Sequence, residues 1–118
     1  ARYADLAEKY IPDAEYEVGT VMKVGGAEEI TAASVGDRAI GVISENPAFM
    51  MNAELEGGVY VALKGRVPVK VKGAVKKGDS LIAFADGYAV QGKGSEVFAI
   101  SLEDSVDPGN KTIEAVIL

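Results

Sequence analysis

One stretch of this chain, residues 59–72, constrains the fold more strongly than any other. Its sequence is VYVALKGRVPVKVK, in which apolar residues fill almost every odd position and the even positions are mainly lysine, arginine and proline. A helix would spread these residues over its whole circumference, whereas an extended chain places the odd positions on one face. The alternation therefore predicts a long β-strand, or a bent pair of strands, with its odd face on the core. Because Gly65 has no side chain and Pro68 cannot donate to a ladder, a bend or bulge is expected near them.

The rest of the chain predicts shorter strands joined by turns. Gly25-Gly26 and Asp86-Gly87 are typical of hairpin turns, and residues 39–43 form an apolar run of the kind that is buried on both faces of a sheet. Further strands are expected at 20–24, 28–32, 80–84, 88–90, 97–101 and 112–118. A Gly-Asp step precedes a predicted strand in both 35–37 and 77–79, which indicates a weak internal repeat.

The first twelve residues predict a short helix and a lead-in to the first strand. Tyr3, Leu6, Ala7 and Tyr10 follow the i, i+3, i+4, i+7 spacing of one apolar stripe, and Pro12 would end the helix. A helix this short is marginal by itself, so it must pack on its own domain or on a neighbour. The whole pattern predicts an all-β fold, as one domain over 1–118. Its β-rich body at 13–118 would be a compact β-barrel or sandwich of about eight to ten short strands, with one short N-terminal helix.

Composition excludes most common catalytic and metal-binding machinery. The 118 residues contain no cysteine and no histidine, so disulfides, thiolate nucleophiles, imidazole bases and the usual zinc ligands are absent. No apolar run approaches the roughly 20 residues that a membrane-spanning helix needs. We therefore expect no cofactor, no metal and no membrane association.

The net charge of −6 is unevenly distributed along the chain. Residues 59–77 carry six bases and no acid, between two acidic flanks. Such a band can bind nucleic acid, but it can equally pair within the fold or with a neighbouring copy. The acidic balance of the whole chain disfavours nucleic acid. Tyr60 is the one aromatic residue interleaved with the bases, which are Lys64, Arg66, Lys70 and Lys72.

Three groups of polar residues could carry chemistry, and each has a simpler structural interpretation. Carboxylate pairs could act as acid and base, although a solvated surface explains them better; they are Glu15 with Glu17 and Glu28 with Glu29. Oxygen ligands for calcium occur near the C-terminus, but the spacing fits no EF-hand loop; they are Asp104, Asp107 and Asn110. The turn Ser44-Glu-Asn-Pro47 could support self-cleavage, but the sequence shows no positioned base. We assign no catalytic residue.

Four blocks of sequence resemble a known family when they are taken in order. They are YADLAEKY at 3–10, YEVGTV at 16–21, GVISENP at 41–47 followed by Met51-Asn52, and LKGRVPV at 63–69 followed by KGD at 77–79. This pattern resembles a C-terminal module of tailed-phage virion proteins, especially tail fibres and other appendages. The first half is also distantly similar to autoproteolytic intramolecular-chaperone domains of phage appendages. The resemblance implies a structural component of the virion, assembled in the host cytoplasm beside other virion proteins, and homotrimeric.

The leading hypothesis is a noncatalytic structural domain that mediates homo-oligomeric assembly of a phage fibre or appendage. Apolar side chains that need a cover are the interface candidates, namely Tyr3, Leu6, Tyr10, Phe49, Met50 and Met51. One alternative is a module that binds a host receptor or glycan through Tyr60, Tyr88 and Asn110. Another is a self-cleaving assembly domain that acts once, at 44–47 or at its upstream boundary.

Overall fold

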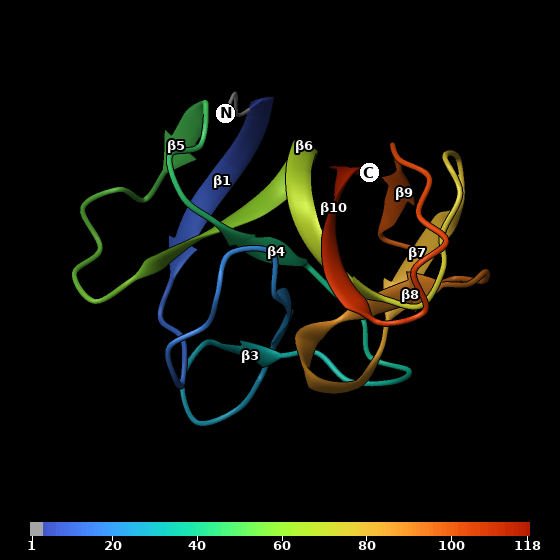
Figure 1. Ribbon diagram of the computed structural model, residues 1–118. Coiled ribbons are helices and arrows are strands. Elements are labelled where there is room, and N and C mark those ends of the chain that lie inside the picture. The colour runs from blue at the N-terminus through green and yellow to red at the C-terminus, as the bar shows by residue number, and fades with distance from the viewer. Residues whose placement is uncertain (1–3) are drawn as a thin grey trace.

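The computed structural model describes residues 4–118, which form ten β-strands and one short 3-10 helix, η1 (Ala85–Gly87) (Figure 1). Within this range no helix has the length and apolarity required to cross a membrane. The strands are β1 (Ala4–Tyr10), β2 (Val21–Val24), β3 (Ile30–Ala32), β4 (Gly41–Ser44), β5 (Phe49–Met51), β6 (Val59–Lys72), β7 (Ser80–Ala83), β8 (Ala89–Gln91), β9 (Ala99–Ser101) and β10 (Asn110–Ile117).

Strand β6 belongs to two closed rings of strands. Its second half pairs with β10, and the ladder continues through β9, β7 and β8 back to Val71 of β6. Its first half pairs with β1 and β4, and the ladder runs on through β2 to β3. A bridge between Ile30 and Pro12 then joins β3 to the chain that leaves β1. The predicted all-β class is confirmed, and of the two predicted architectures, barrel or sandwich, the chain forms a barrel; it is double, with the longest strand shared (Figure 1).

Strands β2, β4 and β6 separate two apolar cores. Because successive residues of a strand point to opposite faces, each of these strands contributes to both. The larger core is shared with β7 to β10, and the smaller one includes Ile30. Side chains directed to the larger core are Val21, Val42 and Ala62, and those directed to the smaller core are Met22, Ile43 and Val61. The expectation that the apolar run 39–43 is buried on both faces is confirmed for residues 41–43, whereas Ala39 and Ile40 are partly buried.

Gly65 bends β6, as the sequence predicts. Its φ angle is +105°, and a Cβ atom added there would lie 2.2 Å from the carbonyl oxygen of Ala4 on β1. Both observations require glycine, because a positive φ strains other residues and β1 leaves no room for a side chain.

The odd positions of β6 do not all face one core, which corrects the prediction made from their alternation. Where β6 pairs with β1, the partners of consecutive β1 residues are Lys64 and then Ala62, so Leu63 is an extra residue in the ladder. This bulge shifts the alternation by one position. As a result Val61 faces the smaller core, whereas the odd positions beyond the bend face the larger core; these are Val67, Val69 and Val71.

The predicted N-terminal helix is wrong, because residues 4–10 form strand β1. The helical spacing of Leu6, Ala7 and Tyr10 is a coincidence of composition, and the real period is two, with Asp5 and Ala7 buried. A seven-residue helix would gain little by itself. As a strand, residues 4–10 pair along their whole length with residues 59–66 of β6. The backbone hydrogen bonds of this pairing favour the strand over the helix.

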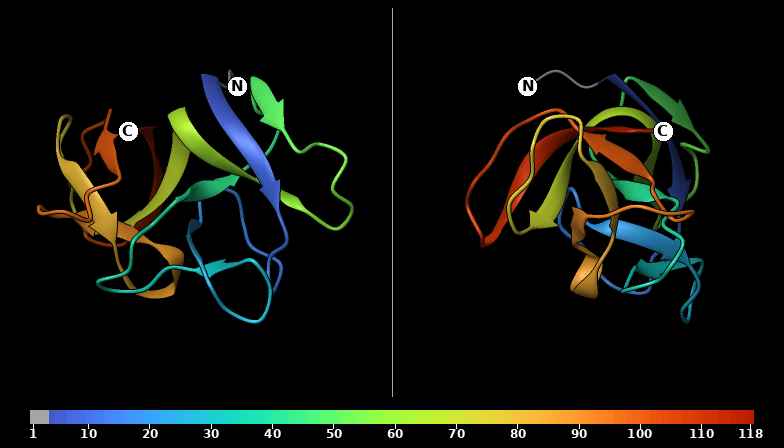
Figure 2. Two further views of the ribbon diagram at one scale, coloured as in Figure 1. Left: turned by 180° about the vertical axis from the view of Figure 1, so that it is seen from behind. Right: turned by 90° about the vertical axis from the view of Figure 1, so that its right-hand side faces the viewer.

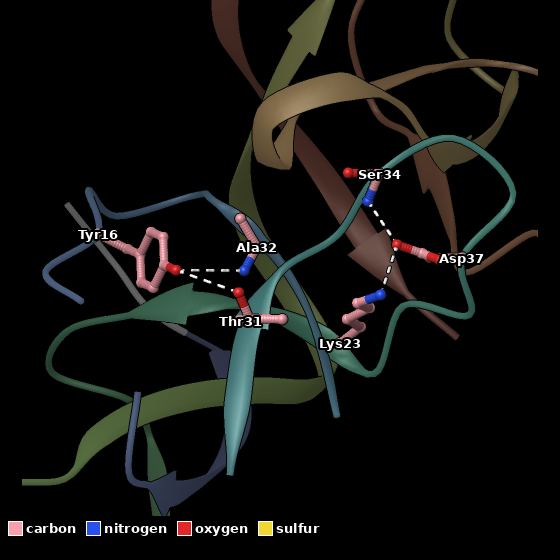
Figure 3. Close-up of polar contacts among 6 residues, drawn as sticks. All are labelled: Tyr16, Lys23, Thr31, Ala32, Ser34 and Asp37. Carbon is pink, nitrogen blue, oxygen red and sulfur yellow. Dashed lines mark hydrogen bonds and ion pairs between the residues drawn. The ribbon is translucent and has the colours of Figure 1, made fainter. Parts of the chain in front are cut away.

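The two Gly-Asp turns share one geometry, which supports the predicted weak repeat. The amide of Ser34 donates to Asp37 Oδ2 at 2.8 Å, and the amide of Lys76 donates to Asp79 Oδ2 at the same distance. The glycine in each turn has positive φ, +83° for Gly36 and +92° for Gly78. Lys23 Nζ also contacts Asp37 Oδ2, at 3.1 Å (Figure 3). The amide of Ser34 and then Lys23 hold the pKa of Asp37 below its usual value.

Tyr16 protects the outer side of β3. Its hydroxyl lies 3.4 Å from Thr31 Oγ1 and accepts a hydrogen bond from the amide of Ala32 at 3.4 Å (Figure 3). The same hydroxyl donates to Asp13, and this bond holds the pKa of that carboxyl below its usual value. The edge of β3 is therefore covered by a side chain from its own chain.

Candidate functional site

Four apolar side chains form an exposed surface at the end of the smaller barrel. We call Leu6, Phe49, Met50 and Met51 the β5 patch. Their exposed fractions are 36%, 70%, 56% and 39% respectively. Successive residues of a strand point to opposite faces, so three exposed residues in a row mean that both faces of β5 are open. Large apolar side chains that are exposed together on neighbouring strands mark interaction sites.

Strand β5 is an edge strand with no protection on its outer side. It pairs in parallel with β1, with Leu6 opposite Phe49, and with no other strand of residues 4–118. Natural edge strands are commonly blunted by shortness, lysine, proline or a bulge; β5 is three residues long, and Phe49-Met50-Met51 contains no lysine, proline or bulge. Figure 2 shows β5 beside β1 at the end of the molecule where the described chain begins.

Two asparagines and a lysine fix the position of β5. Asn46 and Asn52, on either side of the strand, have φ angles of +54° and +61°, a conformation that asparagine tolerates better than most residues. The Asn52 side-chain amide donates to the carbonyl of Lys9 at 3.2 Å. In return, the Lys9 ammonium donates to the carbonyl of Ala53 at 2.9 Å. These contacts hold the exposed strand against β1.

The other two predicted interface residues lie elsewhere. Tyr3 falls outside the described residues. Tyr10 is partly buried against the smaller core, and its hydroxyl donates to Glu8 Oε1 at 3.1 Å. Burial raises the pKa of Tyr10, and the hydrogen bond to Glu8 adds to this effect. The structure therefore brings Leu6 together with Phe49, Met50 and Met51, and it separates Tyr10 from them.

A buried pair that the sequence did not reveal lies behind the patch. Ser44 Oγ donates to Asp5 Oδ2 at 2.8 Å, and both residues are buried. The second oxygen, Asp5 Oδ1, makes no hydrogen bond within residues 4–118. The pair ties β4 to β1 across β6. Sequence reasoning treated Ser44 as a possible nucleophile and gave no role to Asp5, because nothing in a linear pattern places residues 5 and 44 together.

Two of the six bases of the basic band form ion pairs within residues 4–118. Arg66 Nε lies 3.2 Å from Glu114 Oε1, and Lys70 Nζ lies 3.0 Å from Glu17 Oε1. Lys70 also lies over the ring of Tyr88, 4.5 Å from its centroid. Lys64 makes no ion pair with any residue of the described range. These contacts give Arg66 and Lys70 a role within the fold.

The oxygen ligands proposed for calcium are used in other ways. Asp104 Oδ1 accepts a hydrogen bond from the amide of Lys77, and Asp107 Oδ1 accepts one from the amide of Gly109, each at 2.8 Å. The Lys111 ammonium occupies the centre of this loop, where it donates to the carbonyls of Gly73, Asp107 and Gly109. Within residues 4–118, no cluster of three acidic side chains could hold a metal ion.

The carboxylate pairs and the predicted glycan residues have separate places. Glu29 accepts from the amide of Ile11, and Glu17 pairs with Lys70, so each serves the fold. The Lys9 ammonium lies over the ring of Tyr60. Tyr60 does not line the hollow that contains Tyr88. Tyr88 and Asn110 do meet, in a hollow of about 200 Å³ that is also lined by Glu17, Val18, Lys70, Lys111 and Thr112.

With the double barrel and its exposed strand described, the chain can be compared with known structures. It aligns with the C-terminal fragment of bacteriophage phi29 gene product 12 over 97% of this chain and 100% of that fragment, with a TM-score of 0.75 and 17% identity. The two share one fold. The chain also aligns over its whole length with 22% of the pre-mature form of the phi29 gene product 12, with a TM-score of 0.76 and 18% identity.

A second phi29 protein has a related fold. The N base of the phi29 head fibre gp8.5 aligns with 96% of this chain and 93% of its own length, with a TM-score of 0.58 and 15% identity. No protein-family model matches the chain, and no curated protein matches it by sequence. The predicted resemblance to phage fibre and appendage modules is confirmed at the level of the fold.

Proposed function

We propose that this chain is a noncatalytic structural domain of a phage virion protein, and that it mediates homo-oligomeric assembly through the β5 patch. The observation that carries the proposal is an unprotected edge strand, β5, with three large apolar residues exposed in a row. The fold shared with phi29 gene product 12 and head fibre gp8.5 supports a place in the virion.

Physical chemistry favours assembly over an isolated domain. Phe49 and Met50 are more than half exposed, and water would be excluded from them if a partner covered β5. Burial of large apolar side chains is the main driving force of stable protein association. The proposed assembly is a homotrimer, as in the phage appendages that the sequence resembles, formed in the host cytoplasm and retained in the virion beside other virion proteins.

The test is the molar mass in solution of the wild type and of Phe49→Asp. The wild type is expected to have the mass of three chains. A charge at position 49 would be buried without a partner in the assembly, so the variant should be monomeric. Because Phe49 is 70% exposed, the fold of the monomer should survive, which circular dichroism can check.

The matched control is Val106→Asp, at a position that is 93% exposed in the loop between β9 and β10. This variant also replaces an exposed apolar residue with aspartate, and its molar mass in solution should equal that of the wild-type assembly. A monomeric wild type, or a trimer that persists in both Phe49→Asp and Leu6→Asp, would refute assembly through the β5 patch.

A second candidate function is the binding of a host glycan in the hollow that contains Tyr88 and Asn110. Both cations of this hollow are engaged, Lys70 by Glu17 and Lys111 by backbone carbonyls. The hollow therefore suits a neutral polyhydroxyl ligand better than an anion. Titration calorimetry with neutral monosaccharides should give a binding isotherm that Asn110→Ala abolishes; no heat from any of them would refute this function.

Self-cleavage remains a hypothesis. The observation behind this hypothesis is that the Ser44 hydroxyl donates to Asp5, which could accept the proton of an attacking serine. If the reaction occurs, a longer parent chain should appear as two fragments by intact mass spectrometry, and Ser44→Ala should remain whole. A parent chain that stays intact in the wild type would refute it.

A further inference from the structure

We infer that the β5 patch binds a second copy of this chain in a fixed orientation, with the basic border of one copy against the acidic border of the next. This inference rests on the proposed assembly and adds its direction. It is carried by two charged borders, one opposite Leu6 and the other in the loop that follows Met51.

The basic border is Lys64, which lies in the same row of the sheet as the patch. Phe49 is opposite Leu6 in the parallel pair of β5 and β1, and Leu6 is opposite Lys64 in the antiparallel pair of β1 and β6. Directly opposite residues share one face of a sheet. The exposed face therefore runs from Phe49 through Leu6 to the exposed Lys64. Arg66 follows on the same strand and is paired with Glu114.

The acidic border is the loop that follows β5. It contains Glu54 and Glu56, both exposed, and neither makes an ion pair with the described part of the chain. Figure 1 shows this loop leaving β5 on the side away from β10 and leading into the start of β6, whereas Lys64 lies further along β6, opposite Leu6. The Lys9 ammonium donates to the carbonyls of Ala53 and Leu55, at 2.9 and 3.4 Å. These bonds hold the loop, so its carboxylates project from a fixed base.

Charge complementarity identifies the partner as a second copy. A surface that presents Leu6, Phe49 and an unpaired Lys64 requires an apolar partner with an adjacent acidic group. This chain supplies that combination itself, in the β5 patch and the loop with Glu54 and Glu56. Opposite charges at the rim of an apolar interface determine orientation and association rate more than they determine affinity. An arrangement that brought two basic borders or two acidic borders together would be repelled, so the borders favour one orientation of the two copies.

Charge reversal tests the inference. Lys64→Glu and the double variant Glu54→Lys/Glu56→Lys should each raise the dissociation constant of the assembly by about fivefold, because each places like charges together. The triple variant, which combines all three changes, should return the constant to near the wild-type value, since the borders are then complementary with the signs exchanged. Sedimentation equilibrium over a range of protein concentrations measures these constants.

The controls carry the same charge changes away from the patch. Lys77→Glu and Glu28→Lys alter exposed residues of other turns, and neither should change the dissociation constant. Raising the salt concentration should weaken the wild-type assembly, because it screens opposite charges, and should strengthen the Lys64→Glu assembly, because there it screens like charges.

The outcomes separate this inference from the proposed assembly. If Phe49→Asp gives monomers but the charge-reversed variants assemble like the wild type, assembly through the patch is supported and the orientation is refuted. If the single reversals weaken assembly but the triple variant does not recover, Lys64 and the loop do not face each other, and the inference is also refuted. A monomeric wild type refutes both, and would leave the patch to a different partner.

Discussion

At the scale of single residues, the buried pair of Asp5 and Ser44 is the contact whose loss would be most informative. The Ser44 hydroxyl is a hydrogen-bond partner of a carboxylate that is 1% exposed. A buried charged group that loses a donor retains the cost of desolvation without compensation. The pair therefore explains why a polar residue is accepted at the second position of β1.

We predict that Ser44→Ala lowers the free energy of unfolding by about 2 kcal/mol, because Asp5 would lose its hydrogen-bond donor. Urea denaturation measures this loss. Ser95→Ala, at an exposed position, is the control and should change stability by less than about 0.5 kcal/mol. Equal effects of the two substitutions would show that the Ser44 hydroxyl contributes nothing to the fold.

Asp37 should make part of the stability depend on pH. Its folded pKa is held below the ordinary value, first by the amide of Ser34 and then by Lys23. Such a carboxylate stabilises the fold above its unfolded pKa of about 3.9. The contribution is lost as the pH falls through the lower folded pKa. We expect Asp37→Asn, which keeps an acceptor but removes the charge, to be less stable than the wild type at neutral pH and equally stable at the acid end. A difference that is constant with pH would contradict this account.

At the scale of elements, β1 and β6 show what a sequence pattern can and cannot establish. The alternation in 59–72 predicts a long strand or a bent pair of strands, and the structure has a single 14-residue strand that bends at Gly65. It does not predict the bulge at Leu63, because an extra residue in a ladder depends on the partner strand. For β1, the helical spacing predicted the wrong structure. Residues 4–10 form a strand because they pair with an edge of β6, which lies some fifty residues further along the chain.

Substitution of Gly65 should test the bend. Gly65→Ala meets both a positive φ and a carbonyl 2.2 Å from the new Cβ, so a loss of about 3 kcal/mol is expected. Gly73→Ala is the control. Its φ is +85°, but an added Cβ there would meet no atom within 4 Å. That variant should lose only about 1 kcal/mol, from backbone strain alone. Similar losses in thermal unfolding would show that contact with β1 is unimportant.

At the scale of the whole molecule, two cores depend on one strand. Met22 lies in the smaller core and Leu81 in the larger, and β6 contributes side chains to both. Because neither ring closes without β6, we predict that the barrels unfold together. Calorimetry should give one transition whose calorimetric and van't Hoff enthalpies agree.

Met22→Ala and Leu81→Ala should each lower the temperature of this one transition, with a cost of about 2–5 kcal/mol for the cavity that is left. Two separable transitions, with each substitution affecting a different one, would show that the barrels are independent units.

The sequence by itself determined the all-β class, the position of most strands, the bend in β6 and the apolar segment 49–51. These properties are local, because they follow from side-chain periodicity, from glycine at positive φ and from turn residues within a few positions of one another. Only the tertiary structure decided that the strands close into two barrels, that residues 4–10 complete one of them, that Ser44 meets Asp5, and that Lys64 lies beside Leu6. Each of these features depends on the pairing of strands that are distant in sequence. The backbone hydrogen bonds and apolar burial that stabilise this pairing form between segments, so no single segment of the sequence reveals them.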